Sequence, residues 1–299
     1  MRVVVTGGAG FIGKHLVAAL LERGHEVVIV DNLHRARREA VHPDATFIEG
    51  DIRDRSTLAG AFAGAERVFH LAAQSNVMGA LTGTRYSFET NVVGTFNVLE
   101  AATAAGVERV VFSSSREVYG EPEALPVRED APLLAKNPYG ASKLAGEAYC
   151  RTWRHAGAVG VNVLRFTNVY GPGDTGRVIP LWIERASRGL PLEVFGGEQV
   201  IDFVPVRTAV AALIAAGERD LDGPVNVGSG EGTTLLSLAA RIRGMFAICP
   251  GVDILPARTA EVVRFVADVR RMQPELGVAP PGDPLQDLAW LVAPHPRAA

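Results

Sequence analysis

Two side chains four residues apart have the types needed for an acid–base pair. Tyr139 and Lys143 stand at positions i and i+4, so a helix over 139–155 would place them on one face. A phenol acts as a base near neutral pH only if its pKa falls, and a nearby ammonium group lowers it. Asn137 and Pro138 suit the cap and the first position of that helix. The spacing alone is common on exposed helices, so the neighbouring elements decide its meaning.

A serine at the end of a predicted strand could complete a proton relay with this pair. Ser113, Ser114 and Ser115 close the strand expected over 110–112. Ligands bind at the carboxyl ends of parallel strands, and a hydroxyl there can pass a proton between a substrate hydroxyl and Tyr139. Ser113 is explained equally well as a residue that ends the strand, so Ser115 is the stronger candidate.

A glycine loop near the N-terminus has the features of a dinucleotide site. Gly7, Gly10 and Gly13 stand three residues apart, between the run Val3–Val5 and an amphipathic segment. Such a loop permits a tight turn and close approach of a pyrophosphate to amide groups at a helix N-terminus. Asp31 ends the next predicted strand, where a carboxylate binds ribose hydroxyls and repels a 2′-phosphate. The pattern therefore predicts NAD rather than NADP.

Short β-branched runs alternate with longer amphipathic segments over the first two-thirds of the chain. The runs predict strands that are buried on both faces, and the segments between them predict helices. The predicted strands are Val3–Val5, Val27–Val30, Thr46–Ile48, Val68–Leu71, Val110–Phe112 and Val161–Leu164, and the predicted helices are Phe11–Arg23, Thr57–Phe62, Phe88–Ala105 and Tyr139–His155. This alternation implies an α/β fold with a Rossmann-like, doubly wound parallel sheet.

The pattern changes at Gly171-Pro172-Gly173, after which shorter elements follow. Residues 1–170 are expected to form an NAD-binding domain, with 201–227 returning to it. Residues 171–200 and 228–299 are expected to form a smaller substrate-binding lobe over the carboxyl edge of the sheet.

Composition excludes several classes of protein. The 299 residues include 30 Lys+Arg against 33 Asp+Glu, a net charge of −3, which argues against binding to nucleic acid or to a membrane surface. Hydrophobic residues make up 47%, enough for a large core. The two cysteines, Cys150 and Cys249, belong to no metal-binding motif, so no metal site is expected. With neither a secretory signal nor a span long enough for a bilayer, we expect a cytoplasmic protein.

Several motifs together resemble one protein family. They are Thr6–Gly13, Asp31-Asn32-Leu33, His70–Gln74, Asn91–Thr95, Ser113–Gly120, Tyr139–Lys143 and Arg165–Gly173, followed by weaker matches at Pro191–Gly196, Asn226–Gly230 and Arg258–Leu276. The sequence is similar to the extended short-chain dehydrogenase/reductase family, and more narrowly to its NAD-dependent nucleotide-sugar epimerase/dehydratase branch. The resemblance covers nearly the whole chain and is densest before residue 173.

The resemblance implies roles for many residues. Ser115, Tyr139 and Lys143 would form the catalytic triad. NAD would be bound by Gly7, Gly10, Phe11, Ile12, Gly13, Asp31, Asn32, Asp51, Ile52, Leu71, Ala72, Ala73, Asn91, Ser113, Tyr139 and Lys143. The nucleotide-sugar substrate would contact Gln74, Ser115, Arg116, Asn168, Val178, Val194, Phe195, Arg207 and Arg258, with Asn168 at the diphosphate and Val194–Gly196 beside the base. Asp51 could instead cap a turn, Asn168 could be a turn residue, and Phe195 could be a core side chain.

Two departures from the family pattern concern the substrate diphosphate. Ile201 precedes Asp202 where relatives carry an arginine that binds the diphosphate. Isoleucine cannot do so, and Arg258 would then carry more of that task. Arg207-Thr208 replaces the usual aspartate pair of the family, and Arg207 could supply a displaced positive charge.

The residues after Ser115 bear on which reaction of the branch occurs. Members share a first step in which the tyrosine takes the C4 hydroxyl proton, hydride passes to NAD, and a 4-keto sugar forms. Glu117 resembles the acid with which dehydratases and decarboxylases continue, whereas the pKa of Arg116 is too high for a second acid. Arg116 could clamp a uronate carboxylate, point to solvent, or pair with Glu117.

A 4-epimerase needs no catalytic residues beyond Ser115, Tyr139 and Lys143, so it is the function that we expect first. A dehydratase or a UDP-glucuronate decarboxylase that uses Glu117 is the alternative, and a non-catalytic NAD-binding sensor is a further one. In relatives, the helices that correspond to Phe88–Ala105 and Tyr139–His155 pair across a dimer, so a homodimer is expected.

Overall fold

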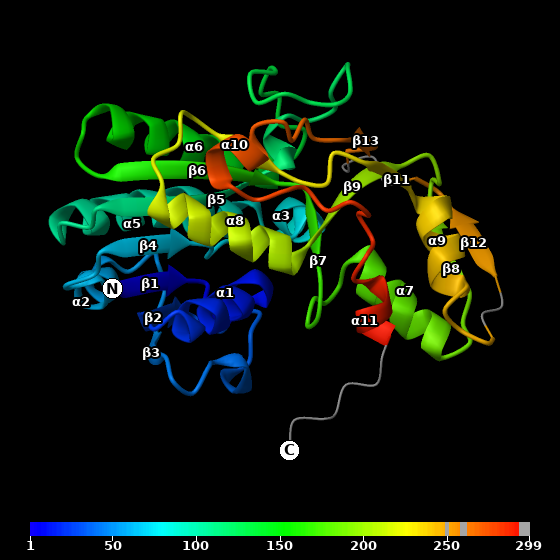
Figure 1. The fold of residues 1–299 in the computed structure, drawn as a ribbon, viewed down its shortest axis with the longest axis horizontal. Helices are drawn as coiled ribbons and strands as arrows, with labels where there is room; N and C mark the ends of the chain where they lie inside the picture. Colours follow the sequence, from blue (N-terminus) through cyan, green and yellow to red (C-terminus); the bar gives the residue numbers. More distant parts are fainter. Residues whose placement is uncertain (249–250, 258–261, 293–299) are drawn as a thin grey trace.

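The β-branched runs form one parallel sheet at the centre of the molecule (Figure 1). The computed structural model describes residues 1–248, 251–257 and 262–292. The strands of the sheet are β1 (Arg2–Thr6), β2 (Glu26–Asp31), β3 (Thr46–Glu49), β4 (Arg67–His70), β5 (Arg109–Ser115), β6 (Gly160–Phe166) and β10 (Val225–Val227), in the order β10-β6-β5-β4-β1-β2-β3. The order reverses between β1 and β4, so a crevice for ligands opens at their carboxyl ends.

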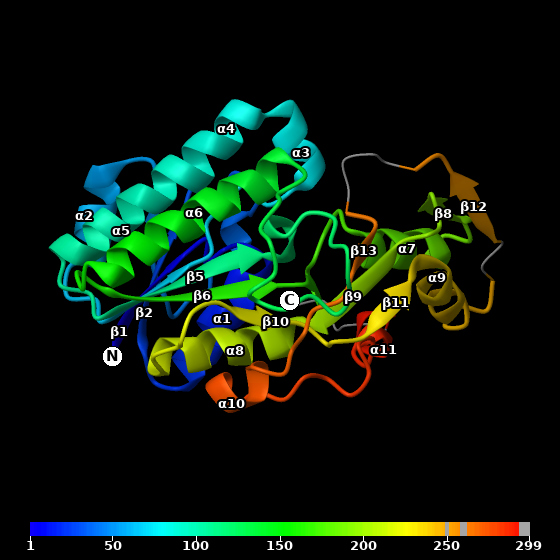
Figure 2. The ribbon, with the colours of Figure 1, turned by 90° about the horizontal axis from the view of Figure 1, so that it is seen from above.

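Helices cover both faces of this sheet (Figure 2). One face carries α1 (Phe11–Glu22), α8 (Val206–Glu218) and α10 (Met272–Leu276), and the other carries α2 (Arg55–Phe62), α5 (Gly94–Ala104) and α6 (Pro138–His155). On each face, the helices and the sheet enclose a separate apolar core. Because the strands are buried on both faces, their sequences are continuous apolar runs rather than alternating patterns. The predicted doubly wound sheet is confirmed.

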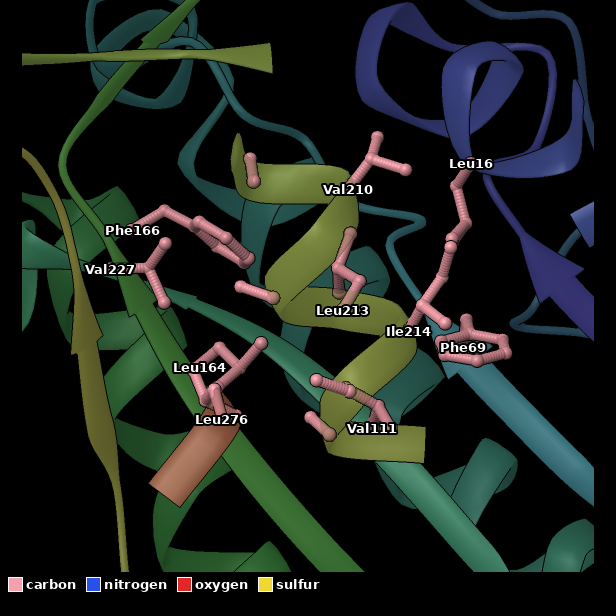
Figure 3. Close-up of a cluster of buried hydrophobic side chains, with 14 of the residues drawn as sticks. Leu16, Phe69, Val111, Leu164, Phe166, Val210, Leu213, Ile214, Val227 and Leu276 are labelled. Carbon is pink, nitrogen blue, oxygen red and sulfur yellow. The ribbon is translucent and has the colours of Figure 1, made fainter. Parts of the chain in front are cut away.

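Helix α8 packs deep in the core on its face of the sheet. Figure 3 shows its residues Val210, Leu213 and Ile214 among side chains from strands of the central sheet and from neighbouring helices. The labelled neighbours are Leu16 of α1, Phe69 of β4, Val111 of β5, Leu164 and Phe166 of β6, Val227 of β10 and Leu276 of α10. Full burial of a leucine such as Leu213 contributes roughly 1.5–3 kcal/mol to stability. The packing therefore fixes a late segment of the chain onto a sheet built mainly from the first half.

The remaining elements gather beyond the carboxyl ends of the central strands (Figure 1). The strand β9 (Val200–Pro205) pairs with β7 (Asn168–Tyr170), β11 (Gly232–Thr234) and β13 (Arg264–Phe265), and β8 (Leu192–Phe195) pairs with β12 (Val252–Leu255). The helices α7 (Val178–Ser187), α9 (Leu235–Arg243) and α11 (Leu288–Val292) contribute to a third apolar core with these strands. Within the segment 201–227, α8 and β10 lie on the large sheet, whereas β9 belongs to this second group.

The predicted strands and helices of the first 166 residues are present, most with small extensions. The predicted helix over 88–105 begins earlier, because α4 (Thr84–Phe88) continues through a π-helical turn at Glu89–Val93 into α5. The short helix α3 (Val77–Thr82) precedes it and was not expected. Through the parts of the chain that the structure describes, no helix has the length and apolar character needed to cross a membrane.

Candidate active site

A cleft of about 1210 Å³ lies at the carboxyl edge of the central sheet. Pockets for one small ligand typically enclose about 300–1,000 Å³, so this cleft has room for two bound molecules. Its walls are the glycine loop after β1, the end of β5, the start of α6 and the first turns of α7. The segments in which the sequence predicted chemistry therefore meet in one place.

Tyr139 lies in the first turn of α6, beside the end of β5. Asn137 caps this helix, because its Oδ1 accepts a hydrogen bond from the Gly140 N–H at 2.9 Å. The Ser115 side chain lies close enough to the Tyr139 phenol to affect its pKa. Burial raises the pKa of Tyr139 to about 12, while the Ser115 hydrogen bond and the positive charge of Arg177 act in the opposite direction. The phenol is therefore protonated here and is held next to a hydroxyl that can share its proton.

Lys143 lies one turn further along the same face of α6. Its Nζ donates a hydrogen bond to the Ser113 carbonyl oxygen at 2.8 Å. Burial lowers the pKa of Lys143 to about 8. The neighbouring His70 is also buried, and burial together with the charge of Lys143 lowers its pKa to about 3. Its ring nitrogens lie 2.8 and 2.9 Å from the Thr6 and Thr95 hydroxyls, so His70 is a neutral structural residue.

Arg116 and Glu117 belong to a buried network at the end of the cleft. Glu117 Oε1 lies 3.0 Å from Arg116 Nη2, and Glu117 Oε2 accepts a hydrogen bond from Asn137 Nδ2 at 2.7 Å. Arg116 Nε donates to Asn168 Oδ1 at 2.7 Å. The Arg116 and Glu117 side chains are only 11% and 6% exposed. Each oxygen of Glu117 thus has one partner in this network, and the Asn168 amide is oriented so that its NH₂ group can donate to an anion.

The glycine loop has a backbone shape that side chains would prevent. Gly7 has φ +74°, and a Cβ on it would lie 2.6 Å from the Ala72 backbone nitrogen. A Cβ on Gly13 would lie 2.1 Å from the Gly7 carbonyl oxygen. Gly10 caps α1 without a side-chain hydrogen bond, so the first amide groups of that helix face the cleft without a side-chain partner at the cap. These features fit the pyrophosphate of a dinucleotide.

Asp31, at the end of β2, has the chemistry that a cofactor ribose requires. Its two carboxylate oxygens accept hydrogen bonds from the Ala9 N–H at 3.1 Å and the Leu33 N–H at 2.9 Å. Burial raises the pKa of Asp31, and these two backbone hydrogen bonds oppose the rise. A carboxylate has about four lone-pair positions, so two remain for the ribose hydroxyls. The residues present therefore fit NAD.

Most of the predicted site residues line the cleft. The lining includes Gly7, Gly10, Phe11, Ile12, Gly13, Asp31, Asn32, Ile52, Leu71, Ala72, Ala73, Gln74, Ser113, Ser115, Arg116, Glu117, Tyr139, Lys143, Asn168, Val178 and Phe195. The cleft lining does not include Asp51, Asn91, Val194 or Arg207. Arg258 lies outside the described residues.

The four predicted residues outside the lining have other partners. Asp51 accepts hydrogen bonds from the Arg53 guanidinium and from the Asn32 amide. Partial burial raises the pKa of Asp51, but these hydrogen bonds outweigh that effect and lower the pKa to about 2. Asn91, in the π-helical turn, holds the backbone of Gln74 through Oδ1 at 2.7 Å and Nδ2 at 3.0 Å. Val194 is a fully buried core residue, and Arg207 pairs with Asp287 at 2.6 Å.

Several charged residues that line the cleft were not selected by sequence reasoning, among them Lys14, Asp174 and Arg177. Burial raises the pKa of Asp174 and lowers that of Lys14. Arg177 lies directly before α7 and pairs with Asp174 at 3.2 Å. Arg177 could have been found from the sequence, because it stands between a glycine-rich loop and the start of a helix. Such positions are typical of anion-binding sites.

A doubly wound sheet with a glycine loop at its crevice and a Ser-Tyr-Lys set beside it defines a dinucleotide-dependent enzyme of the short-chain dehydrogenase/reductase type. A family model described as the NAD dependent epimerase/dehydratase family matches residues 3–228, and the chain belongs to this family.

Similar proteins cover nearly the whole chain. A UDP-glucose 4-epimerase from Mycolicibacterium smegmatis is 37% identical over 295 residues, which is 94% of each chain. The structure of a Thermotoga maritima UDP-glucose 4-epimerase with UDP-glucose has a TM-score of 0.94 at 32% identity and covers 98% of this chain and 97% of that one. A Thermus thermophilus UDP-glucose 4-epimerase in complex with NAD has a TM-score of 0.91 at 35% identity, with 98% of each chain covered.

Relatives with other reactions are similar at a comparable level. UDP-glucuronic acid decarboxylase 1 from Danio rerio is 30% identical over 288 residues, 93% of this chain and 69% of its own. The decision between reactions therefore depends on the geometry of this site.

Proposed function

We propose that this protein is an NAD-dependent nucleotide-sugar 4-epimerase. The observation that carries the proposal is the Ser115–Tyr139–Lys143 set, which lies in a cleft between the glycine loop and Asn168. The glycine loop and Asp31 would hold NAD, which would supply the hydride acceptor and donor for C4 of the sugar. The UDP-glucose 4-epimerases among the similar proteins support this proposal and make a UDP-hexose the expected substrate.

The chain's own residues move and hold the proton of the C4 hydroxyl. Tyr139 takes this proton and gives it back, and Ser115 hydrogen-bonds the phenol while the sugar is in place. The Ser115 hydroxyl and the charge of Arg177 already oppose the effect of burial on the pKa of Tyr139, which is about 12 in the cofactor-free protein. For proton transfer near neutral pH this pKa must fall further when cofactor and substrate are bound. The ammonium group of Lys143, held by the Ser113 carbonyl, lies on the same helix face.

The network around Glu117 favours epimerisation over elimination or decarboxylation. A base at C5 needs a carboxylate oxygen within hydrogen-bond reach of the substrate. Glu117 lines the cleft, but Arg116 holds one of its oxygens and Asn137 the other, and both interactions are buried. Moving the carboxylate toward a sugar would leave the Arg116 guanidinium without this counter-ion, which is costly in a buried site.

The test is a product analysis with the NAD-loaded protein. UDP-glucose, UDP-galactose and UDP-glucuronate are incubated with enzyme, and products are followed by mass spectrometry and NMR. An isomer of unchanged mass is expected, and loss of water or carbon dioxide would contradict the proposal. Tyr139→Phe should lower kcat by about 10²- to 10⁴-fold while the protein keeps NAD. Binding of NAD with no conversion of any nucleotide sugar would instead favour a sensor.

We also propose that the protein forms a homodimer through the helices α4, α5 and α6. Phe88, Val93 and Tyr149 on these helices or at their junction are 49%, 39% and 38% exposed, although all three are large and hydrophobic. Tyr149 packs edge-to-face on Phe96 at 5.4 Å and extends this apolar surface. Val93→Glu should give monomers in light scattering, whereas Leu134→Glu, at a separate and 70% exposed position, should not.

A further inference from the structure

The family resemblance implies an arginine at the substrate diphosphate where this chain has Ile201. Ile201 lines the cleft, so the side chain at the position of the family arginine does reach the site. The next residue along β9, Asp202, points the other way and is buried, where it accepts hydrogen bonds from the Ser229 N–H and hydroxyl at 2.8 and 2.7 Å. The alternation of strand side chains therefore holds an uncharged group where a diphosphate would need a cation.

We propose that Arg177 supplies this charge and binds the diphosphate of the nucleotide sugar. This inference rests on the proposed function, because a nucleotide sugar must occupy the cleft for its diphosphate to be bound there. Arg177 lies directly before α7, whose first residue Val178 also lines the cleft. It lies over the Phe11 ring, 5.6 Å from the centroid, and its charge acts on the Tyr139 phenol.

The guanidinium of Arg177 keeps one edge available for a ligand. Within the described part of the chain, both of its hydrogen bonds use Nη1, to Asp174 Oδ1 at 3.2 Å and to the Val169 carbonyl oxygen at 3.4 Å. The Nε and Nη2 groups form the edge that binds phosphates in a bidentate manner. The Arg177 side chain is 39% exposed, whereas its partner Asp174 is 4% exposed and fixes the direction of the fork.

The neighbours of Arg177 are suited to the same anion. Val169 follows Asn168, whose amide is oriented by Arg116 so that its NH₂ group can donate. The first amide groups of α7 begin directly after Arg177, and its cap makes no side-chain hydrogen bond. A guanidinium edge, a side-chain amide and a helix N-terminus thus surround one position, which matches the several oxygens of a diphosphate.

Three other arginines near this end of the cleft have protein partners. Arg207 does not line the cleft and pairs with Asp287. Arg185 is bound by Glu193 at 3.0 Å and by the Pro191 carbonyl oxygen at 2.6 Å. Arg116 uses Nε and Nη2 within its buried network. Of these four arginines, Arg177 is therefore the one that lines the cleft and keeps its Nε and Nη2 edge for a ligand.

The experiment compares the affinities of UDP and UMP for the NAD-loaded enzyme by calorimetry. The ratio of the two affinities isolates the second phosphate and does not depend on turnover, so it tests Arg177 even if the epimerase assay fails. Wild type should bind UDP more tightly than UMP. Arg177→Gln should lower UDP affinity by about tenfold to a hundredfold, with a smaller effect on UMP, because a charge-assisted hydrogen bond is lost. Arg177→Lys should recover part of the loss, since lysine keeps the charge but not the fork.

The control is Arg207→Gln, which should bind both nucleotides as wild type does. An unchanged UDP-to-UMP ratio in Arg177→Gln would overturn the inference. The same conclusion would follow if Arg177→Gln released NAD while the ratio stayed constant, because the guanidinium would then serve the cofactor pyrophosphate beside Phe11. Thermal unfolding of both Arg177 variants checks that a loss of affinity is not a loss of fold.

Discussion

Oε2 of Glu117 accepts a hydrogen bond from Nδ2 of Asn137, 2.7 Å away. Asn137 also caps α6 through its Oδ1. Glu117 is therefore joined, through Asn137, to the start of the helix that carries Tyr139. A Cβ on Gly140 would lie 2.4 Å from the Glu117 carbonyl oxygen, which shows how closely the two segments approach. The relationship makes Glu117 a residue that positions the catalytic helix.

Glu117→Gln tests this positioning role against a role in proton abstraction. The variant keeps the shape and an acceptor for Asn137 but removes the charge that faces Arg116, so we expect less than about a tenfold loss of kcat together with a lower Tm. Loss of a catalytic base would instead cost about 10²- to 10⁴-fold. Assays in D₂O, read by NMR, should show no deuterium at C5 of the sugar. Asp130→Asn, in an exposed pair with Arg128, is the control and should leave both readouts unchanged.

Removal of Arg165 should strongly destabilise the protein. Its Nη2 lies 2.6 Å from Glu147 Oε2, both side chains are 2% exposed, and Nη1 donates to the Tyr119 hydroxyl at 2.8 Å. Arg165→Met leaves the Glu147 carboxylate buried without its counter-ion, so unfolding by urea should show a loss of about 3–5 kcal/mol.

Two further variants separate the buried pair from an ordinary one. Combining Arg165→Met with Glu147→Leu should recover part of the stability, because no buried charge is left unpaired. Arg128→Met breaks a pair whose side chains are 62% and 70% exposed, and it should cost less than about 1 kcal/mol. Equal losses of unfolding free energy in Arg165→Met and Arg128→Met would contradict the prediction that the buried pair contributes more to stability.

Lys143 should make the stability of the cofactor-free protein rise at alkaline pH. Burial lowers its pKa from 10.5 in the unfolded chain to about 8 in the folded one. Below pH 8 both states carry the proton, whereas between pH 8 and 10.5 only the unfolded state does, so a rise in pH favours the folded state. The gain of wild type relative to Lys143→Met should reach about 3 kcal/mol by pH 10.5.

Urea unfolding of wild type and Lys143→Met at a series of pH values measures this gain. Comparison with the variant is needed because Tyr139 has the opposite effect above pH 10, where its raised pKa favours the unfolded state in both proteins. A difference between the two proteins that stayed constant from pH 7 to 10.5 would show that Lys143 has its ordinary pKa.

Gly13→Ala should abolish binding of NAD. The new Cβ would lie 2.1 Å from the Gly7 carbonyl oxygen, which is backbone and cannot move without changing the loop. Gly10→Ala should have a milder effect on folding, since its Cβ would lie 3.1 Å from the same oxygen. Gly60→Ala in α2 is the control, because a Cβ there meets nothing within 4 Å and alanine favours a helix by roughly 0.5–1 kcal/mol. Calorimetric titration with NAD and thermal unfolding distinguish the three variants.

Local patterns in the sequence determined six of the seven strands of the central sheet, the glycine loop and the shared face of Tyr139 and Lys143. Apolar runs, glycine spacing and helical periodicity act over a few residues, so they can be interpreted without the rest of the chain. The same holds for Asp31, whose place at the end of β2 follows from the length of one strand–helix–strand unit.

Tertiary packing decided the directions of the charged side chains, because their partners are remote in sequence. Only the fold brings Arg116 to Asn168, joins Glu117 to Asn137 and pairs Arg207 with Asp287 outside the cleft. The free edge of Arg177 depends in the same way on how the loop after β7 presents Asp174. Sequence thus predicted the class of chemistry, whereas long-range contacts determined which charges are available to carry it out.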